Sequence, residues 1–198
     1  MMGRTTAVYF SSSNPQKHVD IARLFHDSPN PPRSLRQEVP EVLSYDLEAI
    51  VRAKAIAAYK LAFVPLFVEH GGLYVEALGE LPGPLVKLFC ERLSLLELCR
   101  LIPAGTSRRA EFRQRVCYCD GKQLQVHAGS IRGVIAEEPR GDQGIHWDPV
   151  FIPDGATETM GEMTPERRLA AFGESGAFGN LRRALGLGRR RPHHDHDA

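Results

Sequence analysis

The sequence predicts an α/β domain with an antiparallel insertion. Three observations support this class. A strand leads through a polar turn into a helix near the N-terminus, an alanine-rich helix precedes further strand-like apolar runs, and two long alternating segments meet at one Asp-Gly turn. With 198 residues and 42% hydrophobic composition, the chain is long enough to bury a real core. We therefore place one folded domain at residues 1–187.

The first third of the chain predicts one strand and two helices. Residues 7–10 fit a buried strand, and residues 14–27 carry apolar side chains at close to helical spacing. Residues 28–34, SPNPPRS, predict a loop because they are rich in proline and small polar residues. Residues 46–62, DLEAIVRAKAIAAYKLA, predict a long helix with Asp46 as its N-cap.

The centre of the chain predicts two short strands around a sharp turn. The strands are residues 64–69, VPLFVE, and 73–78, LYVEAL, with His70-Gly71-Gly72 between them. A helical region is expected next, over residues 83–102, followed by antiparallel strands over 109–121 and 123–139 that are joined at Asp120-Gly121. A strand is expected within 147–155. Two helices should end the domain, one from Thr164-Pro165 to near Gly173 and a short one within 179–188.

Composition argues against several partners and locations. The 25 basic and 24 acidic residues nearly balance, so no global field favours nucleic acid or an anionic membrane. The N-terminus has no signal-peptide pattern, and no apolar run approaches the roughly 20 residues that span a bilayer. The four cysteines lack CxxC spacing, which predicts reduced thiols in a cytoplasmic protein. Residues 188–198, rich in arginine and histidine, predict a disordered tail that binds metal only adventitiously.

A polar strand-to-helix turn is the first candidate site. Ser12, Ser13, Asn14 and Lys17 combine hydroxyls, an amide and a cation where a helix begins. Free backbone N–H groups at a helix N-terminus favour anions, so this turn predicts a phosphate cradle. The alternative is an ordinary Ser/Asn cap before a helix. The turn is no Walker A loop, because its glycines and Gly-Lys-Ser/Thr are missing.

Charged residues elsewhere suggest a metal and a second phosphate contact. Lys54 lies between two alanines in the alanine-rich helix, where a solvent-facing lysine is the plain alternative. Glu41 and Glu69, with His70, bring oxygen ligands from two segments that suit Mg²⁺. The alternative is that these carboxylates are simply solvated.

A loop dense in glycine and proline, residues 139–149, holds the only tryptophan of the chain. Trp147 is an aromatic that can stack on a base, and Asp148 is a carboxylate that can accept from a purine edge. The alternative is a packed turn with Trp147 as its plug.

Taken in order, these stretches resemble the inosine triphosphate pyrophosphatase family. The resemblance runs from about Ala7 to Met163. It is carried by SSSNPQK, which is similar to the family's phosphate loop, by VEHGGLYVEALGELPGPLVKLF, which is similar to its catalytic strand, and by PRGDQGIHWDPVFIPDG, which is similar to its base-binding loop.

The resemblance implies an elongated fold with a central twisted mixed sheet flanked by helices, an antiparallel lobe and a nucleotide cleft between lobes, usually in a homodimer. It also implies Mg²⁺-dependent cleavage of a non-canonical purine nucleoside triphosphate to the monophosphate and pyrophosphate. The implied roles are phosphate binding by Ser12, Ser13, Asn14, Lys17, Lys54 and Arg168, Mg²⁺ binding by Glu41 and Glu69, and proton abstraction by His70. Gly71 is expected to contact the substrate, and Ile145, His146, Trp147 and Asp148 are expected to bind the base.

The sequence departs from the family pattern at several of these positions. His70 replaces the second acid of the catalytic strand, which is both a metal ligand and the proposed base, and Gly71 replaces the next hydroxyl. Imidazole can act as a base near neutral pH but is a poor Mg²⁺ ligand. Ile145 replaces the stacking phenylalanine, and His146 replaces a glycine.

The helix near residue 170 departs as well. Phe172-Gly173-Glu174 stand where the family has Ser-His-Arg, while Arg168 keeps the charge of a family lysine. Arg182 or Arg183 would approach the same space if the preceding loop folds back. Two alternatives therefore stay open: an impaired or retooled homologue that binds a different or modified nucleotide, and a subunit that only dimerises.

Overall fold

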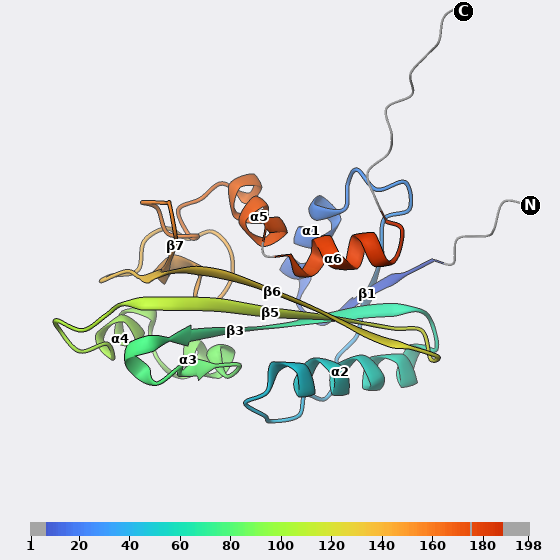
Figure 1. Cartoon of the computed structure of the whole chain (residues 1–198), viewed down its shortest axis with the longest axis horizontal. Coiled ribbons are helices and arrows are strands. Elements are labelled where there is room, and N and C mark those ends of the chain that lie inside the picture. The colour runs from blue at the N-terminus through green and yellow to red at the C-terminus, as the bar shows by residue number, and fades with distance from the viewer. Residues whose placement is uncertain (1–6, 175, 188–198) are drawn as a thin grey trace, which may run out of the picture.

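The computed structural model describes residues 7–174 and 176–187. Within them one long mixed sheet separates two layers of helices (Figure 1), which confirms the α/β class and the flanked mixed sheet. The strand order is β2-β1-β3-β5-β6-β7, with β4 added to β3. Their bounds are β1 Tyr9–Ser12, β2 Arg33–Arg36, β3 Leu66–Val75, β4 Pro82–Gly83, β5 Arg109–Cys119, β6 Leu124–Ile135 and β7 Phe151–Pro153.

The sheet has a short parallel part and a long antiparallel part. Strand β1 pairs parallel with β2 and β3, whereas β3, β5, β6 and β7 pair antiparallel in sequence. The antiparallel ladder between β3 and β5 runs from Leu66 opposite Cys119 to Val75 opposite Ala110. This ladder is the rigid floor on which the candidate site is built.

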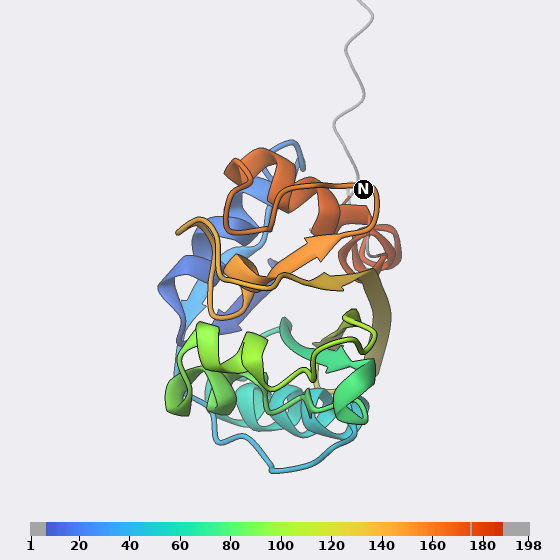
Figure 2. The same ribbon diagram turned by 90° about the vertical axis from the view of Figure 1, so that its left-hand side faces the viewer.

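Helices cover both faces of the sheet (Figures 1 and 2). Helices α2, α3 and α4 lie on one face, and α1, α5 and α6 lie on the other. Their bounds are α1 Pro15–Leu24, α2 Leu47–Ala62, α3 Val86–Arg92, α4 Leu95–Arg100, α5 Pro165–Glu174 and α6 Ala177–Ala184, with 3-10 turns η1 Glu76–Leu78 and η2 Asp148–Val150. No helix within the described ranges is both long and apolar enough to cross a bilayer.

Three apolar clusters hold these layers together. Under α1 and α6, Phe10, Phe67 and Phe178 belong to one buried cluster, whereas Val51 and Val68 belong to another beneath α2. The third cluster fills the end of the molecule that carries α4 and β7. Its buried members include Leu73, Leu98, Phe112, Trp147 and Phe151. Burial of such side chains is the main favourable term for the fold.

The structure corrects the predicted turn at residues 70–72. Strand β3 runs without interruption through His70, Gly71 and Gly72. The two glycines permit close packing instead: a Cβ at Gly71 would lie 2.5 Å from the Phe112 ring, and one at Gly72 would lie 2.8 Å from the Gly83 backbone. The two glycines therefore allow other parts of the chain to pack closely against β3, and the chain does not reverse direction at them.

Two further expectations are corrected. Arg33 and Ser34, placed in a loop by the sequence, begin β2, an edge strand with little buried apolar surface and therefore no alternating pattern. The helical region over 83–102 is two helices, because Ser94 starts α4 through a capping box with Glu97.

Other expectations are confirmed. Asp46 caps α2 by accepting a hydrogen bond from the Glu48 backbone N–H at 2.8 Å. Gly121 has a φ of +84° in the hairpin that joins β5 and β6. Helix α5 ends at Glu174, next to the expected Gly173. The predicted tail at 188–198 lies outside the described residues.

Candidate functional site

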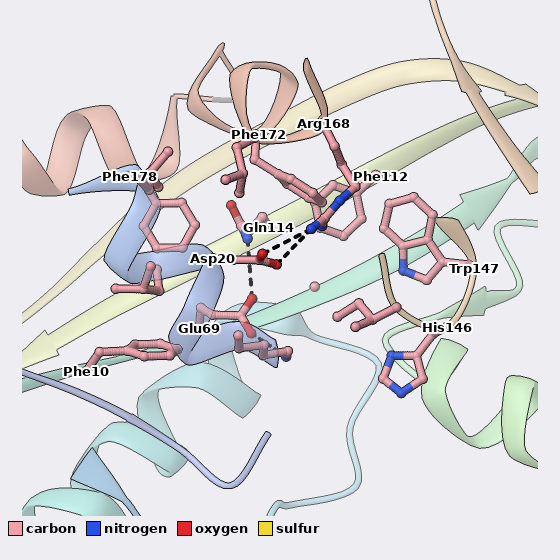
Figure 3. Close-up of a pocket in the computed structure, with 16 residues that line it drawn as sticks. Phe10, Asp20, Glu69, Phe112, Gln114, His146, Trp147, Arg168, Phe172 and Phe178 are labelled. Atoms are coloured by element: carbon pink, nitrogen blue, oxygen red, sulfur yellow. Dashed lines mark hydrogen bonds and ion pairs between the residues drawn. The ribbon is translucent and has the colours of Figure 1, made fainter. Parts of the chain in front are cut away.

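A cleft opens between the helices α1, α5 and α6 and the face of the sheet formed by β3 and β5. Most of its lining is apolar: Phe10, Ile21, Leu24, Phe112, Ile145, Trp147, Leu169, Phe172 and Phe178. Its polar lining is Lys17, Asp20, Glu69, Gln114, His146 and Arg168. Figure 3 shows Phe10 and Phe178 at one end, Trp147 and His146 at the other, and Glu69, Gln114, Asp20 and Arg168 between them. An apolar cleft with a few convergent polar groups is typical of a small-molecule site.

The strand-to-helix turn before α1 contains both an ordinary helix cap and a cation that reaches the cleft. Asn14 is an ordinary N-cap, since its side chain accepts from the Gln16 N–H at 2.9 Å. Ser12 Oγ accepts from the Asn14 N–H at 3.1 Å, while Ser13 is exposed. Lys17, one turn later, takes no part in the cap and forms an ion pair with Glu69 across the cleft. The cap therefore orients α1, and Lys17 carries the positive charge into the site.

Glu69 is a buried carboxylate held by several partners. Its Oε1 binds Lys17, and its Oε2 accepts from Gln114 Nε2 at 3.3 Å. Burial alone would raise the pKa of Glu69, but Lys17 and Lys54 lower it to about 2. Glu69 is therefore ionised at neutral pH. The other amide atom, Gln114 Oε1, is buried and has no hydrogen-bond partner within residues 7–174 and 176–187.

Residue 70 points to the other face of β3, as the alternation of strand side chains requires. His70 Nδ1 lies 3.8 Å from Glu41 Oε2, and His70 Nε2 lies 3.3 Å from the Pro84 carbonyl oxygen. Burial lowers the pKa of His70 despite the opposing effect of Glu41, so the ring is neutral at pH 7.

Lys54 of α2 contacts Glu41 and the backbone of β3. Its Nζ donates to Glu41 Oε1 at 2.5 Å and to the Glu69 carbonyl oxygen at 3.4 Å. The side chain is only 11% exposed, which overturns the reading of a solvent-facing lysine. Burial would raise the pKa of Glu41, but Lys54 lowers it. Lys17 and Lys54 thus approach Glu69 from two elements far apart in sequence.

The loop before η2 uses its aromatic ring for packing. The Trp147 ring is 5% exposed and lies 4.7 Å, centroid to centroid, from the Phe112 ring. Trp147 is therefore a packed plug that still lines the cleft. His146 beside it has a φ of +49°, in the left-handed region where its family counterpart is glycine. Burial and Lys17 lower the pKa of His146. Ile145 supplies only an aliphatic surface.

Asp148 is fully buried at the back of this loop. Its Oδ2 accepts from the Ile145 N–H at 2.8 Å and lies 3.6 Å from Arg168. Burial raises its pKa to about 7 against the effect of these partners. A Cβ at Gly144 would lie 1.8 Å from Asp148 Oδ2, so glycine is required for this approach. Asp148 shapes the loop and does not line the cleft.

Arg168 lies in the cleft with its charge already balanced. It donates to Asp20 at 3.0 and 3.2 Å and also faces Asp148. Phe172, one turn later, lines the cleft with an apolar ring where the family has a serine. Arg182 is not among the residues that line the cleft. Its guanidinium donates to Asp27 Oδ1 at 2.6 Å and to the carbonyl oxygen of Leu24, a lining residue, at 3.0 Å, and its replacement of the missing arginine stays a prediction.

The Mg²⁺ ion that the resemblance implies does not fit these side chains as a resident cofactor. Within the described residues, no group of three or more His, Cys, Asp or Glu side chains is placed to hold a metal. Glu41 already binds Lys54, and Glu69 binds Lys17 and Gln114. The donor nearest to Glu41 is an imidazole, whereas Mg²⁺ prefers oxygen.

Sequence reasoning missed two polar residues of the cleft. Asp20 follows Lys17 by three residues on α1, a spacing that puts both on one helix face. Gln114 shares a face of β5 with Phe112 and Val116, so a polar residue interrupts a buried apolar row. Each signal was available in the sequence, but neither identifies its partner across the fold.

Comparison with known proteins identifies the family of the chain. A model of the Ham1 family matches residues 8–183. A dITP/XTP pyrophosphatase from Saccharolobus solfataricus is 32% identical over 168 residues, covering 85% of this chain and 88% of that protein. Inosine triphosphate pyrophosphatase 2 from Trypanosoma cruzi is 37% identical over 137 residues, covering 68% and 70% of the two chains.

Solved structures share the fold. A HAM1 protein from Coxiella burnetii superposes with a TM-score of 0.75 at 21% identity, covering 92% of this chain and 100% of that chain. The Ham1 protein of Staphylococcus aureus gives a TM-score of 0.72 at 23% identity, covering 91% and 98%. The resemblance to the inosine triphosphate pyrophosphatases is thereby confirmed, and the chain belongs to the Ham1 family.

Proposed function

We propose that this protein is a nucleotide pyrophosphohydrolase that cleaves a non-canonical purine nucleoside triphosphate to the monophosphate and pyrophosphate. The observation that carries the proposal is the approach of Lys17 and Lys54 to Glu69 at the edge of an apolar cleft. The names of its relatives, dITP/XTP and inosine triphosphate pyrophosphatases, support the substrate class.

The lysines would bind phosphate oxygens in exchange for their carboxylate partners. Both cations form ion pairs with carboxylates, Lys17 with Glu69 and Lys54 with Glu41. A triphosphate carries more negative charge than either carboxylate, so it competes for the same ammonium groups. Ser12 and Ser13, at the start of α1, would add hydroxyl donors. The phosphates therefore belong at this end of the cleft.

His70 is the proposed general base for the attacking water. Its ring is neutral at pH 7, so it can accept a proton. It lies within reach of the Glu41 carboxylate, which would stabilise the imidazolium that forms. A divalent cation bound with the phosphates, Mg²⁺ by resemblance, would neutralise charge on the triphosphate.

The base would lie deeper, between the aromatic side chains. Asp20 and Arg168 present an acceptor and a donor to a purine edge, and Gln114 Oε1 is an acceptor without a partner in the described part of the chain. Phe112 and Phe172 give apolar surface for the ring in place of the aromatic lost at Ile145.

Pyrophosphate release tests the proposal. Full-length protein would be incubated with ITP, XTP, dITP, ATP and GTP in the presence of divalent cations, and pyrophosphate and monophosphate would be measured. We expect release from ITP, XTP or dITP above that from ATP and GTP. No release from any of them by folded protein at high concentration would overturn the proposal.

A nucleotide-binding protein without turnover is the second candidate. It is favoured by one observation: His70 occupies the position of the family's catalytic acid. Thermal stabilisation by ITP without any product would identify it.

Exposed apolar side chains and the cysteines bear on the assembly and the location of the protein. We propose a homodimer, which the exposed Val42, Leu43, Leu81 and Leu88 support as apolar surface available for an interface. We propose a cytoplasmic location, which the four free cysteines support. Light scattering after gel filtration tests the dimer.

A further inference from the structure

Gln114 of β5 has a side-chain amide whose orientation is decided by its surroundings. The residue is only 4% exposed, and its Nε2 lies 3.3 Å from Glu69 Oε2. Glu69 is ionised at neutral pH, because its pKa is about 2, and a carboxylate can only accept hydrogen bonds. The NH₂ group of Gln114 therefore faces Glu69, since a flipped amide would bring two acceptors together.

The carboxylate that orients this amide is itself held in place. Glu69 Oε1 forms an ion pair with Lys17 of α1, and the Glu69 side chain is buried in β3. Phe112 and Val116 lie on either side of Gln114 on the same face of β5, and both are buried. The amide is therefore confined to one orientation by a charged partner and by close packing.

The other end of the amide, Oε1, is an acceptor that no donor of the protein reaches. It is buried and has no hydrogen-bond partner in the part of the chain that the structure describes, although Gln114 lines the cleft. Figure 3 shows Nε2 directed at Glu69 and Oε1 on the opposite side of the amide. Because neighbouring atoms cover the oxygen, a ligand reaches it after a small movement of the lining side chains.

The carboxylates of the cleft are already engaged. Asp20 accepts from Arg168 at 3.0 and 3.2 Å and from Gln16 at 3.1 Å. Both oxygens of Glu69 are paired as well. Among the acidic and amide side chains described in the cleft lining, Gln114 therefore has the oxygen that a ligand can pair without competing with a protein donor. Such an acceptor favours a ligand that brings a donor and rejects one that brings an acceptor or an apolar group.

We infer that Gln114 determines base specificity: its Oε1 accepts the N1–H of a 6-oxopurine and excludes bases that have an unprotonated nitrogen or an alkyl group at this position. In a nucleotide, N1–H is the only N–H of hypoxanthine, so it is the donor that fits. Adenine presents an acceptor at N1. Guanine has the same N1–H, so Gln114 does not separate it from hypoxanthine. The inference rests on the proposed function, because it takes the purine to lie against Gln114.

A methyl group at N1 of the base tests the inference, because it replaces the donor and leaves the triphosphate as it is. Pyrophosphate release from ITP and from 1-methylinosine triphosphate would be measured with the full chain and with Gln114→Met. Methionine is unbranched like glutamine, so it disturbs the packing least. The control is Gln125→Leu, which removes a glutamine of β6 outside the cleft lining.

We expect the original protein to favour ITP over the methylated analogue by about tenfold or more in kcat/KM. Gln114→Met should lower this preference about fivefold or more, whereas Gln125→Leu should leave it unaltered. A loss of packing or of the bond to Glu69 would affect both substrates equally, because their phosphates are the same. An equal preference in Gln114→Met and the original protein would therefore overturn the inference. So would the absence of any preference in the original protein, a result that does not depend on how the variant folds.

Binding measurements keep this test separate from that of the proposed function. Calorimetry of both nucleotides in EDTA should show the same preference in Kd, and Gln114→Met should reduce it. Release from ITP with a preference that Gln114→Met leaves unchanged removes this inference alone. A preference in Kd that Gln114→Met reduces, without release from any nucleotide, removes the proposed function alone. If ITP neither binds nor reacts, both are wrong.

Discussion

At the scale of single residues, Gln114 shows how a buried amide links the two halves of the cleft floor. Its Nε2 donates to Glu69, and its Oε1 has no hydrogen-bond partner among the residues that the structure describes. An unpaired buried acceptor costs free energy, so its retention is consistent with a ligand that pairs with it. The unpaired Oε1 therefore lowers the folding stability, whereas the same atom would strengthen the binding of a ligand.

Gln114→Leu tests both roles of this side chain. Leucine removes the unpaired acceptor but also leaves the ionised Glu69 carboxylate without one of its donors, so we expect the free energy of unfolding to fall by about 1–3 kcal/mol. The KM for the nucleotide should rise about fivefold, with kcat less affected, because a neutral hydrogen bond is worth roughly 1 kcal/mol. Urea denaturation and pyrophosphate release measure the two. An unchanged KM would show that Oε1 meets no ligand.

Glu69 should make the free energy of unfolding depend on pH below pH 4.5. Its folded pKa of about 2 lies below the ordinary value of 4.5, so its ionisation stabilises the fold fully above pH 4.5. That contribution is lost as the pH falls from 4.5 toward 2, and it is of the order of a few kcal/mol.

Glu69→Gln removes this titration. We expect the variant to be less stable than the original protein at pH 7 but to lose less unfolding free energy between pH 5 and pH 2. Chemical denaturation at a series of pH values measures both slopes. Parallel slopes for the two proteins would mean that the carboxylate is not held by Lys17 in solution.

At the scale of elements, β3 and β4 show why glycine is required at Gly72. A Cβ there would lie 2.8 Å from the Gly83 carbon and 2.9 Å from the Pro84 nitrogen, and backbone atoms cannot rotate aside. We expect Gly72→Ala to lower the free energy of unfolding by about 1–3 kcal/mol through overpacking.

The matched control is Gly173→Ala on α5, where the nearest atom to a Cβ is 3.8 Å away. Helix propensity predicts that this variant gains up to about 1 kcal/mol. Thermal unfolding of both variants gives the comparison. A Gly72→Ala protein as stable as the original would remove close packing as the reason for this glycine.

Elements with local signals could be predicted from the sequence, and elements held by distant partners could not. Helix α2 carries its own N-cap at Asp46, and the β5–β6 hairpin carries its own turn at Gly121. Strand β2 has no such signal, because Arg33 to Arg36 become a strand only through pairing with β1. The same limit applies to the site: Lys17 was found by motif, but its pairing with Glu69 depends on the packing of α1 over β3.

At the scale of the whole molecule, the cleft joins parts of the chain that are far apart in sequence. Its lining comes from β1, α1, β3, β5, the loop before η2, α5 and α6. A bond between Arg168 and Asp20 already ties α5 to α1. A ligand in the cleft contacts all these elements at once, so its binding is linked to global unfolding and not to the opening of one loop.

Nucleotide binding should therefore stabilise the entire fold. At a concentration one hundred times its Kd, a ligand that binds only the folded state adds about 2.7 kcal/mol to the free energy of unfolding. We expect ITP with EDTA, which suppresses metal-dependent turnover, to shift the urea midpoint upward in one cooperative transition. Inorganic pyrophosphate, which reaches only the lysines, should stabilise less. Equal shifts with pyrophosphate and ITP would locate binding at Lys17 and Lys54 alone and leave the aromatic part of the cleft without a role in recognition.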